Sequence, residues 1–300
     1  MQYPSTLGWG KTKDGGIEMW DTDPIFFDTP SLLARAKLLF YPKKFFLYRA
    51  IGKALREHEK NGEARPFRIL DAGCGTGATV IDLVRLFGSR VEVVGVDVIR
   101  LQIDIGRQKL AAHQVHARLE WYDGDILPFS DRYFDAVYTS DVLGHVHNAS
   151  AWLSDIARVL KPHGLLAMFT ESRPGKHAVV RRYVLRKGIN IDPHAEFHIS
   201  LYEKKEIQTM LHSAGFVWSF FSAGPALHFF LYPDEGYLVL QKAKHISVLK
   251  KMNAWGAFVK KKLHPYSTAL VELLVTIHFA TLGKLLETQG YLVVARKEKK

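Results

Sequence analysis

The sequence has little that could crosslink, anchor or divide the chain. Among its 300 residues there is one cysteine, Cys74, so an internal disulfide is excluded. Residues Met1 to Trp20 hold no apolar run of the kind that a signal peptide needs. Internal repeats are also absent, and the only biased segment is the charged stretch Arg296 to Lys300. We therefore expect an intracellular globular protein.

Acidic residues are outnumbered. Lysine and arginine total 41 against 30 aspartates and glutamates, which gives a net charge of +11 and favours anionic partners such as phospholipid surfaces, nucleic acid or phosphorylated substrates. No acidic residue lies between Glu235 and Glu272, so this segment carries much of the excess. Its lysines are Lys242, Lys244, Lys250, Lys251, Lys260, Lys261 and Lys262.

The hydrophobic residues alternate between strand-like and helix-like spacing. The predicted strands cover residues 67–71, 91–98, 118–122, 134–139, 164–170, 216–222 and 291–295. Predicted helices cover 79–87, 101–113, 151–160 and 202–214, and a basic loop joins the fifth strand to the last of these helices. This order predicts an α/β, Rossmann-like, doubly wound fold with a mostly parallel seven-stranded sheet, which binds ligands at the carboxyl ends of its strands.

Two segments extend this core. We expect residues 1–66 to form an N-terminal helical arm, 67–222 with 291–300 to form the core, and 223–290 to be a helical insertion. The insertion could be a lid, a membrane-facing cap, or ordinary core of an enlarged domain.

Two helices are predicted within this insertion. One of them places Val248, Met252, Trp255 and Val259 on one side, with lysines around the rest. The other, Ala269 to Leu286, is mainly apolar, but charged residues inside it argue against a membrane span.

A glycine-rich turn follows the first strand. The stretch Asp71-Ala72-Gly73-Cys74-Gly75-Thr76-Gly77 runs into a helix, and glycine lets bare backbone approach a nucleotide-like ligand. Asp97 ends the next strand, where a carboxylate can accept both ribose hydroxyls. Because Gly73-x-Gly75-x-x-Ala78 also fits a loose dinucleotide pattern, an NAD(P)-dependent oxidoreductase is an alternative.

Further motifs accompany the turn in a fixed order. They are Gly95-Val96-Asp97, Asp123-Gly124-Asp125-Ile126-Leu127-Pro128-Phe129, Phe134-Asp135-Ala136-Val137 and Leu160-Lys161-Pro162-His163-Gly164. With them the chain resembles the class I S-adenosylmethionine-dependent methyltransferases, in particular the small-molecule branch that includes ubiquinone and menaquinone biosynthesis enzymes. The resemblance covers about Arg68 to Phe216 and resumes at Tyr291.

The resemblance implies S-adenosylmethionine as cofactor and assigns roles around it. Residues Asp71, Ala72, Gly73, Cys74, Gly75 and Gly77 would wrap the methionine end, and Asp97 with Val98 would meet the ribose. Either Asp123 or Asp125 would meet the adenine, and we favour Asp125 because Gly124 directly precedes it. Ile126 and Ser140 complete the predicted cofactor site. We interpret Cys74 as a small buried residue and not as a nucleophile.

The acceptor side is expected after the fourth and fifth strands. Methyl transfer needs alignment and water exclusion but no metal, and no metal site is predicted. Asp141, His145 and His147 are candidate bases for an acceptor hydroxyl, and a helical segment would place Asp141 one turn from His145. The alternative is that Asp141 caps a short helix and the histidines only line the cleft. His198 and Tyr202 are candidate acceptor contacts.

We expect a small, lipophilic or aromatic acceptor. Nucleic acid is less favoured, because Thr139-Ser140-Asp141-Val142 lacks the Asn/Asp-Pro-Pro-aromatic signature that the resemblance implies for methylation of base amines. An RNA or protein methyltransferase and a non-catalytic cofactor-binding scaffold are further alternatives. The basic insertion also predicts contact with an anionic membrane surface, so a cytoplasmic enzyme could sit on the inner membrane face.

Overall fold

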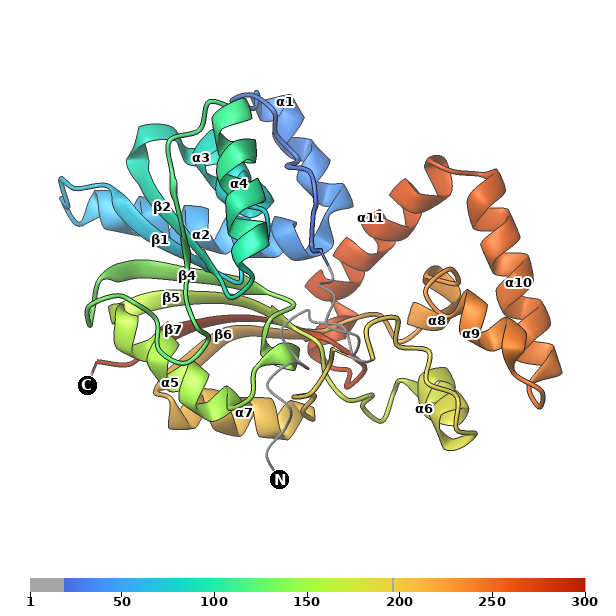
Figure 1. Ribbon diagram of the computed structural model, residues 1–300. Coiled ribbons are helices and arrows are strands. Elements are labelled where there is room, and N and C mark those ends of the chain that lie inside the picture. Colours follow the sequence, from blue (N-terminus) through green and yellow to red (C-terminus); the bar gives the residue numbers. More distant parts are fainter. Residues whose placement is uncertain (1–18, 196, 300) are drawn as a thin grey trace.

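A seven-stranded sheet runs through the computed structural model, which describes residues 19–195 and 197–299 (Figure 1). Its strand order is β3-β2-β1-β4-β5-β7-β6. The strands are β1 Phe67–Ala72, β2 Val91–Asp97, β3 Arg118–Trp121, β4 Phe134–Ser140, β5 Leu160–Thr170, β6 Phe216–Ala223 and β7 Tyr291–Lys297. Only β7 runs antiparallel to its neighbours, β5 and β6. The predicted Rossmann-like, mostly parallel seven-stranded sheet is confirmed.

Helices cover both faces of the sheet because successive side chains of a strand point to opposite sides. In β5, Leu166 and Met168 belong to the core on one face of the sheet. Helices α5 (Ala149–Val159) and α7 (Lys204–Ser213) lie on that face (Figure 1). Leu165 and Ala167 face the other core. The helices on that side are α2 (Pro42–Lys60), α3 (Ala78–Phe87) and α4 (Arg100–Ala112).

The carboxyl ends of the central strands form one edge of the sheet, and that edge carries acidic residues. Asp71 pairs in register with Gly95 of β2 and with Tyr138 of β4. Asp97 ends β2, while Asp141 and Glu171 directly follow β4 and β5. The parallel register therefore brings carboxylates from four strands to the same side of the molecule.

Before the sheet, the described chain forms α1 (Leu32–Arg35), a 3-10 helix over Ala36–Phe40, and α2. One face of α2 buries Leu47, Tyr48, Ile51 and Leu55 against the sheet. Residues 1–18 of the predicted arm lie outside the described residues. The limits of the arm, the core and the insertion remain predictions.

Between β6 and β7 the chain forms α8 (His228–Leu231), α9 (Tyr237–Lys242), α10 (Ser247–Lys262) and α11 (Tyr266–Ala280). In Figure 1, α10 and α11 project from the sheet as an angled pair. The prediction that the second long helix reaches Leu286 is wrong, because α11 ends at Ala280 and a 3-10 helix over Leu282–Lys284 follows. None of the helices within residues 19–195 and 197–299 is long and apolar enough to cross a membrane.

Two local predictions between the strands are also wrong. The expected basic loop after β5 contains α6 (Val179–Arg186), whose buried Val184 packs against Phe229, Leu240 and Ile246 of the later segment. After β4 there is no full helical turn from Asp141 to His145. Instead Asp141 has a left-handed backbone, with φ of 61°, and only Leu143–His145 forms a 3-10 helix.

Candidate functional site

A cavity of about 1120 Å³ opens at the carboxyl edge of the sheet. It runs from the glycine-rich turn, at Asp71, Gly73 and Gly75, to the inner face of α11, at Glu272 and Phe279. Ligand sites for one drug-sized molecule occupy about 300–1000 Å³. The cavity therefore has room for two small molecules side by side.

The glycine-rich turn has no space for a Cβ atom at Gly73 or Gly75. A Cβ on Gly73 would lie 2.2 Å from Val142 Cγ2, and one on Gly75 would lie 2.9 Å from the Trp20 carbonyl. Both glycines have φ in the left-handed region. Asp97 fixes the turn from the next strand, because its carboxylate accepts 2.9 Å hydrogen bonds from the backbone N–H groups of Gly75 and Ile99.

Asp71 is a buried acid that lines the cavity at the end of β1. Burial raises the pKa of Asp71 to about 8, with Lys44 opposing the shift and Asp97 adding to it. Its Oδ2 atom has no hydrogen-bond partner among the described residues. A buried hydrogen-bond acceptor usually has a partner. The free Oδ2 of Asp71, beside the glycine-rich turn, could therefore accept a hydrogen bond from a donor group of a ligand, such as an ammonium.

The segment before α1 crosses the turn and closes one side of the cavity. The backbone N–H of Trp20 donates to Gln102 Oε1. The centre of the Trp20 ring lies 4.7 Å from the centre of the His194 ring. The Thr76 hydroxyl donates to Asp21 at 2.7 Å. Asp82 of α3 accepts from the backbone N–H groups of residues 25 and 26. No residue of this segment was predicted from the sequence to belong to the site.

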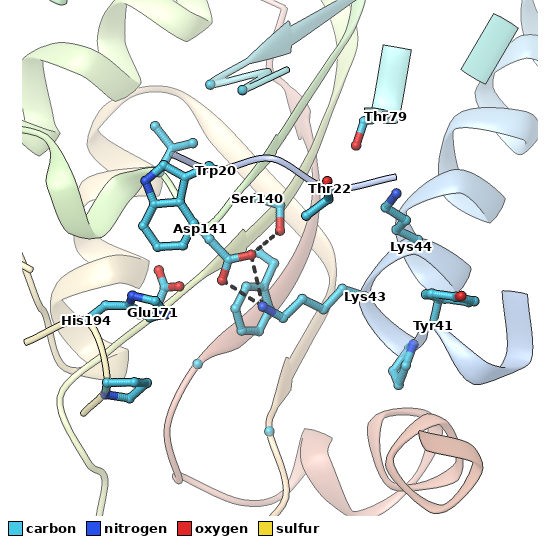
Figure 2. Close-up of a pocket in the computed structure, with 18 of the residues that line it drawn as sticks. Trp20, Thr22, Tyr41, Lys43, Lys44, Thr79, Ser140, Asp141, Glu171 and His194 are labelled. Atoms are coloured by element: carbon cyan, nitrogen blue, oxygen red, sulfur yellow. Dashed lines mark hydrogen bonds and ion pairs between the residues drawn. The ribbon is translucent and has the colours of Figure 1, made fainter. Parts of the chain in front are cut away.

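The same cavity is lined by a cluster of three ionisable side chains, Lys43, Asp141 and Glu171 (Figure 2). The ammonium of Lys43 donates to both oxygens of Asp141, at 2.7 and 2.9 Å, and lies 3.8 Å from the centre of the Phe169 ring. The Ser140 hydroxyl also donates to Asp141, at 2.6 Å.

The pKa values of the two carboxyl groups in the cluster are shifted in opposite directions. Burial and the neighbouring charge of Asp141 hold the pKa of Glu171 well above its usual range. Burial also acts to raise the pKa of Asp141, but Lys43 and the hydrogen bonds outweigh it, so that pKa is lowered. The cluster therefore favours an ionised Asp141 beside the Lys43 ammonium, while the environment of Glu171 favours its protonated form.

Two histidines complete the wall beside this cluster. Burial, with the nearby His198, lowers the pKa of His145 to about 4, so its ring is neutral. Its Nδ1 lies 3.0 Å from the Phe197 carbonyl, a contact that a neutral ring makes by donating Nδ1–H, which leaves Nε2 as an acceptor. His198 contacts Asp192 through Nδ1 at 2.7 Å.

The structure brings part of the predicted site together. Its cavity is lined by Asp71, Gly73, Cys74, Gly75, Asp97, Val98, Ser140, Asp141, His145 and His198. Ala72 and Gly77 flank the turn without lining the cavity. Cys74 is buried, and burial raises the pKa of its thiol well above the usual value, as expected of a small buried residue.

Other predicted residues lie elsewhere. His147 is exposed and outside the cavity, and Tyr202 packs against the core beside α7. The loop of Asp123, Gly124, Asp125 and Ile126 also lies outside the cavity wall, and the Asp123 carboxylate accepts a hydrogen bond from the backbone N–H of Asp125. The adenine contact of either aspartate remains a prediction. Asp141 caps no helix: the 3-10 helix Leu143–His145 has Val142 at its N-cap and no side-chain cap, and the Asp141 carboxylate is paired with Lys43.

Trp20, Lys43 and Glu171 line the cavity but were not among the residues predicted from the sequence. A signal for Glu171 was present, because it is an acid directly after a predicted strand, like Asp71, Asp97 and Asp141. Lys43 gave no such signal. It reaches the site only because α2 crosses the sheet edge 98 residues before Asp141 in the chain.

Comparisons with known proteins agree with this geometry. Residues 69–164 match a family model described as a methyltransferase domain. A demethylmenaquinone methyltransferase of Tropheryma whipplei is 34% identical over 179 residues, which cover 53% of this chain and 72% of that protein. A ubiquinone/menaquinone biosynthesis C-methyltransferase of Proteus mirabilis is 35% identical over 118 residues, 39% of this chain and 47% of that protein.

A solved structure shares the fold over most of its length. It is a protein of Galdieria sulphuraria named as a candidate sarcosine dimethylglycine methyltransferase. The TM-score is 0.52 at 15% sequence identity, and the match covers 92% of this chain and 94% of that one.

Proposed function

The chain belongs to the class I S-adenosylmethionine-dependent methyltransferases, and from that premise we propose that it methylates a small lipophilic or aromatic acceptor by in-line displacement. S-adenosylmethionine is its cofactor. The observation that carries the proposal is that one cavity is lined both by the glycine-rich turn and by the cluster of Lys43, Asp141 and Glu171.

The donor fits the end of the cavity beside the turn. Asp71 offers its unpartnered Oδ2 to the methionine ammonium, and the backbone of Gly73 and Gly75 leaves room for the methionine chain. Asp97 retains lone pairs beyond those used by the turn, and these can accept from the ribose hydroxyls. The positive sulfonium would then lie among carboxylates, which suits its charge.

The acceptor fits the opposite end. Phe169, Tyr232 and Phe279 line that part of the cavity and suit an apolar or aromatic body. Relatives named as demethylmenaquinone methyltransferases support an acceptor of the quinone type. The charged cluster suits a hydroxyl on such a ring, because the Lys43 ammonium stabilises an oxygen that becomes negative.

The bases available beside the cluster limit the kind of hydroxyl. Asp141 and His145 both have pKa values below their usual range, so each is a weak base at neutral pH. A weak base suits an acceptor that is itself acidic, such as a phenol or an enol. In the transfer the acceptor atom bonds to the methyl carbon, the carbon–sulfur bond breaks, S-adenosylhomocysteine leaves, and the hydroxyl proton passes to the base.

The decisive experiment supplies methyl-labelled S-adenosylmethionine and fractionated cell extract to the purified protein. We expect the label to enter lipid-soluble aromatic molecules. Label in RNA or protein would contradict a small acceptor, and the absence of any transfer, with intact donor binding, would favour a scaffold. Calorimetry with S-adenosylhomocysteine and with NAD(H) tests the donor site, where only the first should bind.

The variant Asp97→Ala tests the assigned ribose contact. Removing the carboxylate also frees the Gly75 N–H, so we expect S-adenosylhomocysteine binding to be lost, and near-normal affinity would contradict the assignment.

The location belongs to the same proposal. A lipophilic acceptor resides in membranes, and the excess of lysine in the insertion favours an anionic surface. We therefore propose a cytoplasmic enzyme that contacts the inner membrane face.

A further inference from the structure

The apolar side of α10 faces outward. Val248, Met252 and Trp255 lie one turn apart on the helix, and their side chains are 69%, 46% and 70% exposed. The opposite side holds the helix on the protein, where Asn253 is buried and its amide donates to the Pro233 carbonyl at 2.7 Å. A helix that packs on its own protein buries its apolar side, so this orientation needs an outside partner.

The next helix continues the same kind of surface. On α11, Tyr266 is 82% exposed and Leu270 58% exposed, and Leu274 and Ile277 follow on the same side. The opposite side of α11 lines the cavity through Glu272, Val275 and Phe279. One helix therefore separates the acceptor end of the cavity from an exposed apolar stripe.

Lysines surround this apolar surface. Lys251, Lys261 and Lys262 are exposed on α10, while Lys260 is paired with Asp234 and Lys250 donates to the Gln241 carbonyl. No acid occurs between Glu235 and Glu272. Exposed apolar side chains with lysines beside them, on a helix too short and too charged to span, are the pattern of a helix that lies in a membrane interface.

We propose that this surface, formed by α10 and the outer side of α11, docks on an anionic lipid membrane. A second copy of the chain is a poorer partner, because a two-fold contact would bring the same lysines together. Nucleic acid would use the lysines but leave Val248, Met252 and Leu270 in water. The role of this docking rests on the proposed function. A lipophilic acceptor would leave the bilayer beside α11 and enter the cavity at Phe279 and Glu272.

Flotation with vesicles tests the docking without any donor or acceptor. We expect the protein to float with vesicles of phosphatidylcholine and phosphatidylglycerol at low salt, to be released at high salt, and to stay behind with phosphatidylcholine alone. Replacing Lys251, Lys261 and Lys262 together by glutamate should weaken binding at least about a hundredfold, at about fivefold for each lysine.

A second variant tests the apolar contact. Replacing Val248, Met252 and Trp255 together by serine should abolish flotation at any salt concentration. These side chains are exposed, so the fold should persist. The matched controls are Val217→Ser, an exposed apolar residue on β6, and the double change Lys53→Glu and Lys205→Glu on α2 and α7. Neither control should change binding by more than about twofold.

The emission of Trp255 reports contact at the residue itself. The blue shift on adding anionic vesicles should disappear in Trp255→Phe, while flotation persists. Absence of flotation of the wild type, equal weakening by the controls, or a dimer that the serine variant dissociates would each overturn the proposal. Flotation together with methylation of only water-soluble acceptors would leave the docking intact and contradict the proposed acceptor.

Discussion

Asp71 is the residue whose ionisation we expect to govern donor binding. Its pKa is about 8 in the free protein, so below that pH the carboxyl holds a proton. The donor's ammonium prefers the ionised form, and its binding must then expel the proton. The affinity for S-adenosylhomocysteine should therefore rise with pH, by up to about fiftyfold between about pH 6 and 8. The reason is that the fraction of the protein with an ionised Asp71 rises over this range.

Calorimetry in buffers of different ionisation enthalpy measures both the affinity and the released proton. Asp71→Asn should bind more weakly and lose the pH dependence, whereas Asp28→Asn, an exposed acid before α1, should behave as the wild type. An affinity that falls as the pH rises would contradict the role of Asp71.

Lys43 should affect the acceptor and not the donor. Lys43→Met removes the ammonium that faces Asp141, so we expect kcat to fall by about a hundredfold, as when one preorganised electrostatic group is removed. Lys43→Arg should recover part of the rate, because it restores the charge. Lys53→Met, on the exposed side of α2, is the control. Loss of S-adenosylhomocysteine affinity in Lys43→Met would show that the residue acts through the fold.

The cavity residues around the glycine-rich turn could be predicted to lie together because they are local in sequence. Asp71, Gly73 and Gly75 form one turn, and Asp97 follows the next strand, so a short motif contains their geometry. The part of the cavity that we propose for the acceptor depends on tertiary contacts. Lys43 comes from a helix 98 residues before its partner, and Trp20 comes from an irregular segment, so no spacing in the sequence brings either of them to the cavity.

At the scale of elements, Asp82 joins three parts of the structure. This fully buried carboxylate accepts from the backbone of residues 25 and 26, from Lys44 and from the Tyr48 hydroxyl. Asp82→Asn keeps the size of the side chain but removes the negative charge that pairs with the Lys44 ammonium. Breaking a buried pair in this way should lower the free energy of unfolding by about 3 kcal/mol.

Urea unfolding followed by circular dichroism measures the loss. Asp104→Asn, which removes an exposed acid on α4, should change the free energy of unfolding by less than about 0.5 kcal/mol. Because residues 25 and 26 continue the segment that holds Trp20, the Asp82 variant should also open that side of the cavity, and a protease should cut residues 19–27 faster. An unchanged unfolding curve would mean that Asp82 does not hold these parts together.

The elements themselves were predictable where their apolar spacing is regular. The strands of the sheet and the helices α3, α4, α5 and α7 follow from local periodicity. Helix α6 was missed because its one buried residue, Val184, packs against Phe229 and Leu240 far along the chain, and arginines occupy much of the rest. For α10 the sequence predicted the apolar side but not its direction. The outward direction depends on the tertiary contact between the buried Asn253 amide and the Pro233 carbonyl.

At the scale of the whole molecule, the core and the insertion share one cavity. The core supplies the glycine-rich turn and the strand ends, while α11 of the insertion closes the other end. Its single cysteine, Cys74, is buried with a raised pKa, so the protein has no accessible thiol to carry the methyl group. Under the proposed function we therefore expect both substrates to occupy the cavity together, so that the methyl group moves directly between them.

This arrangement predicts sequential kinetics. Initial rates measured against S-adenosylmethionine at several acceptor concentrations should give intersecting lines in double-reciprocal plots, because no methylated enzyme forms between two half-reactions. Cys74→Ala should keep the sequential pattern and most of the rate. Parallel lines, or a methyl group retained on the protein after the donor is removed, would contradict direct transfer. If the pattern is intersecting, S-adenosylhomocysteine should compete with the donor and not with the acceptor, since each ligand has its own end of the cavity.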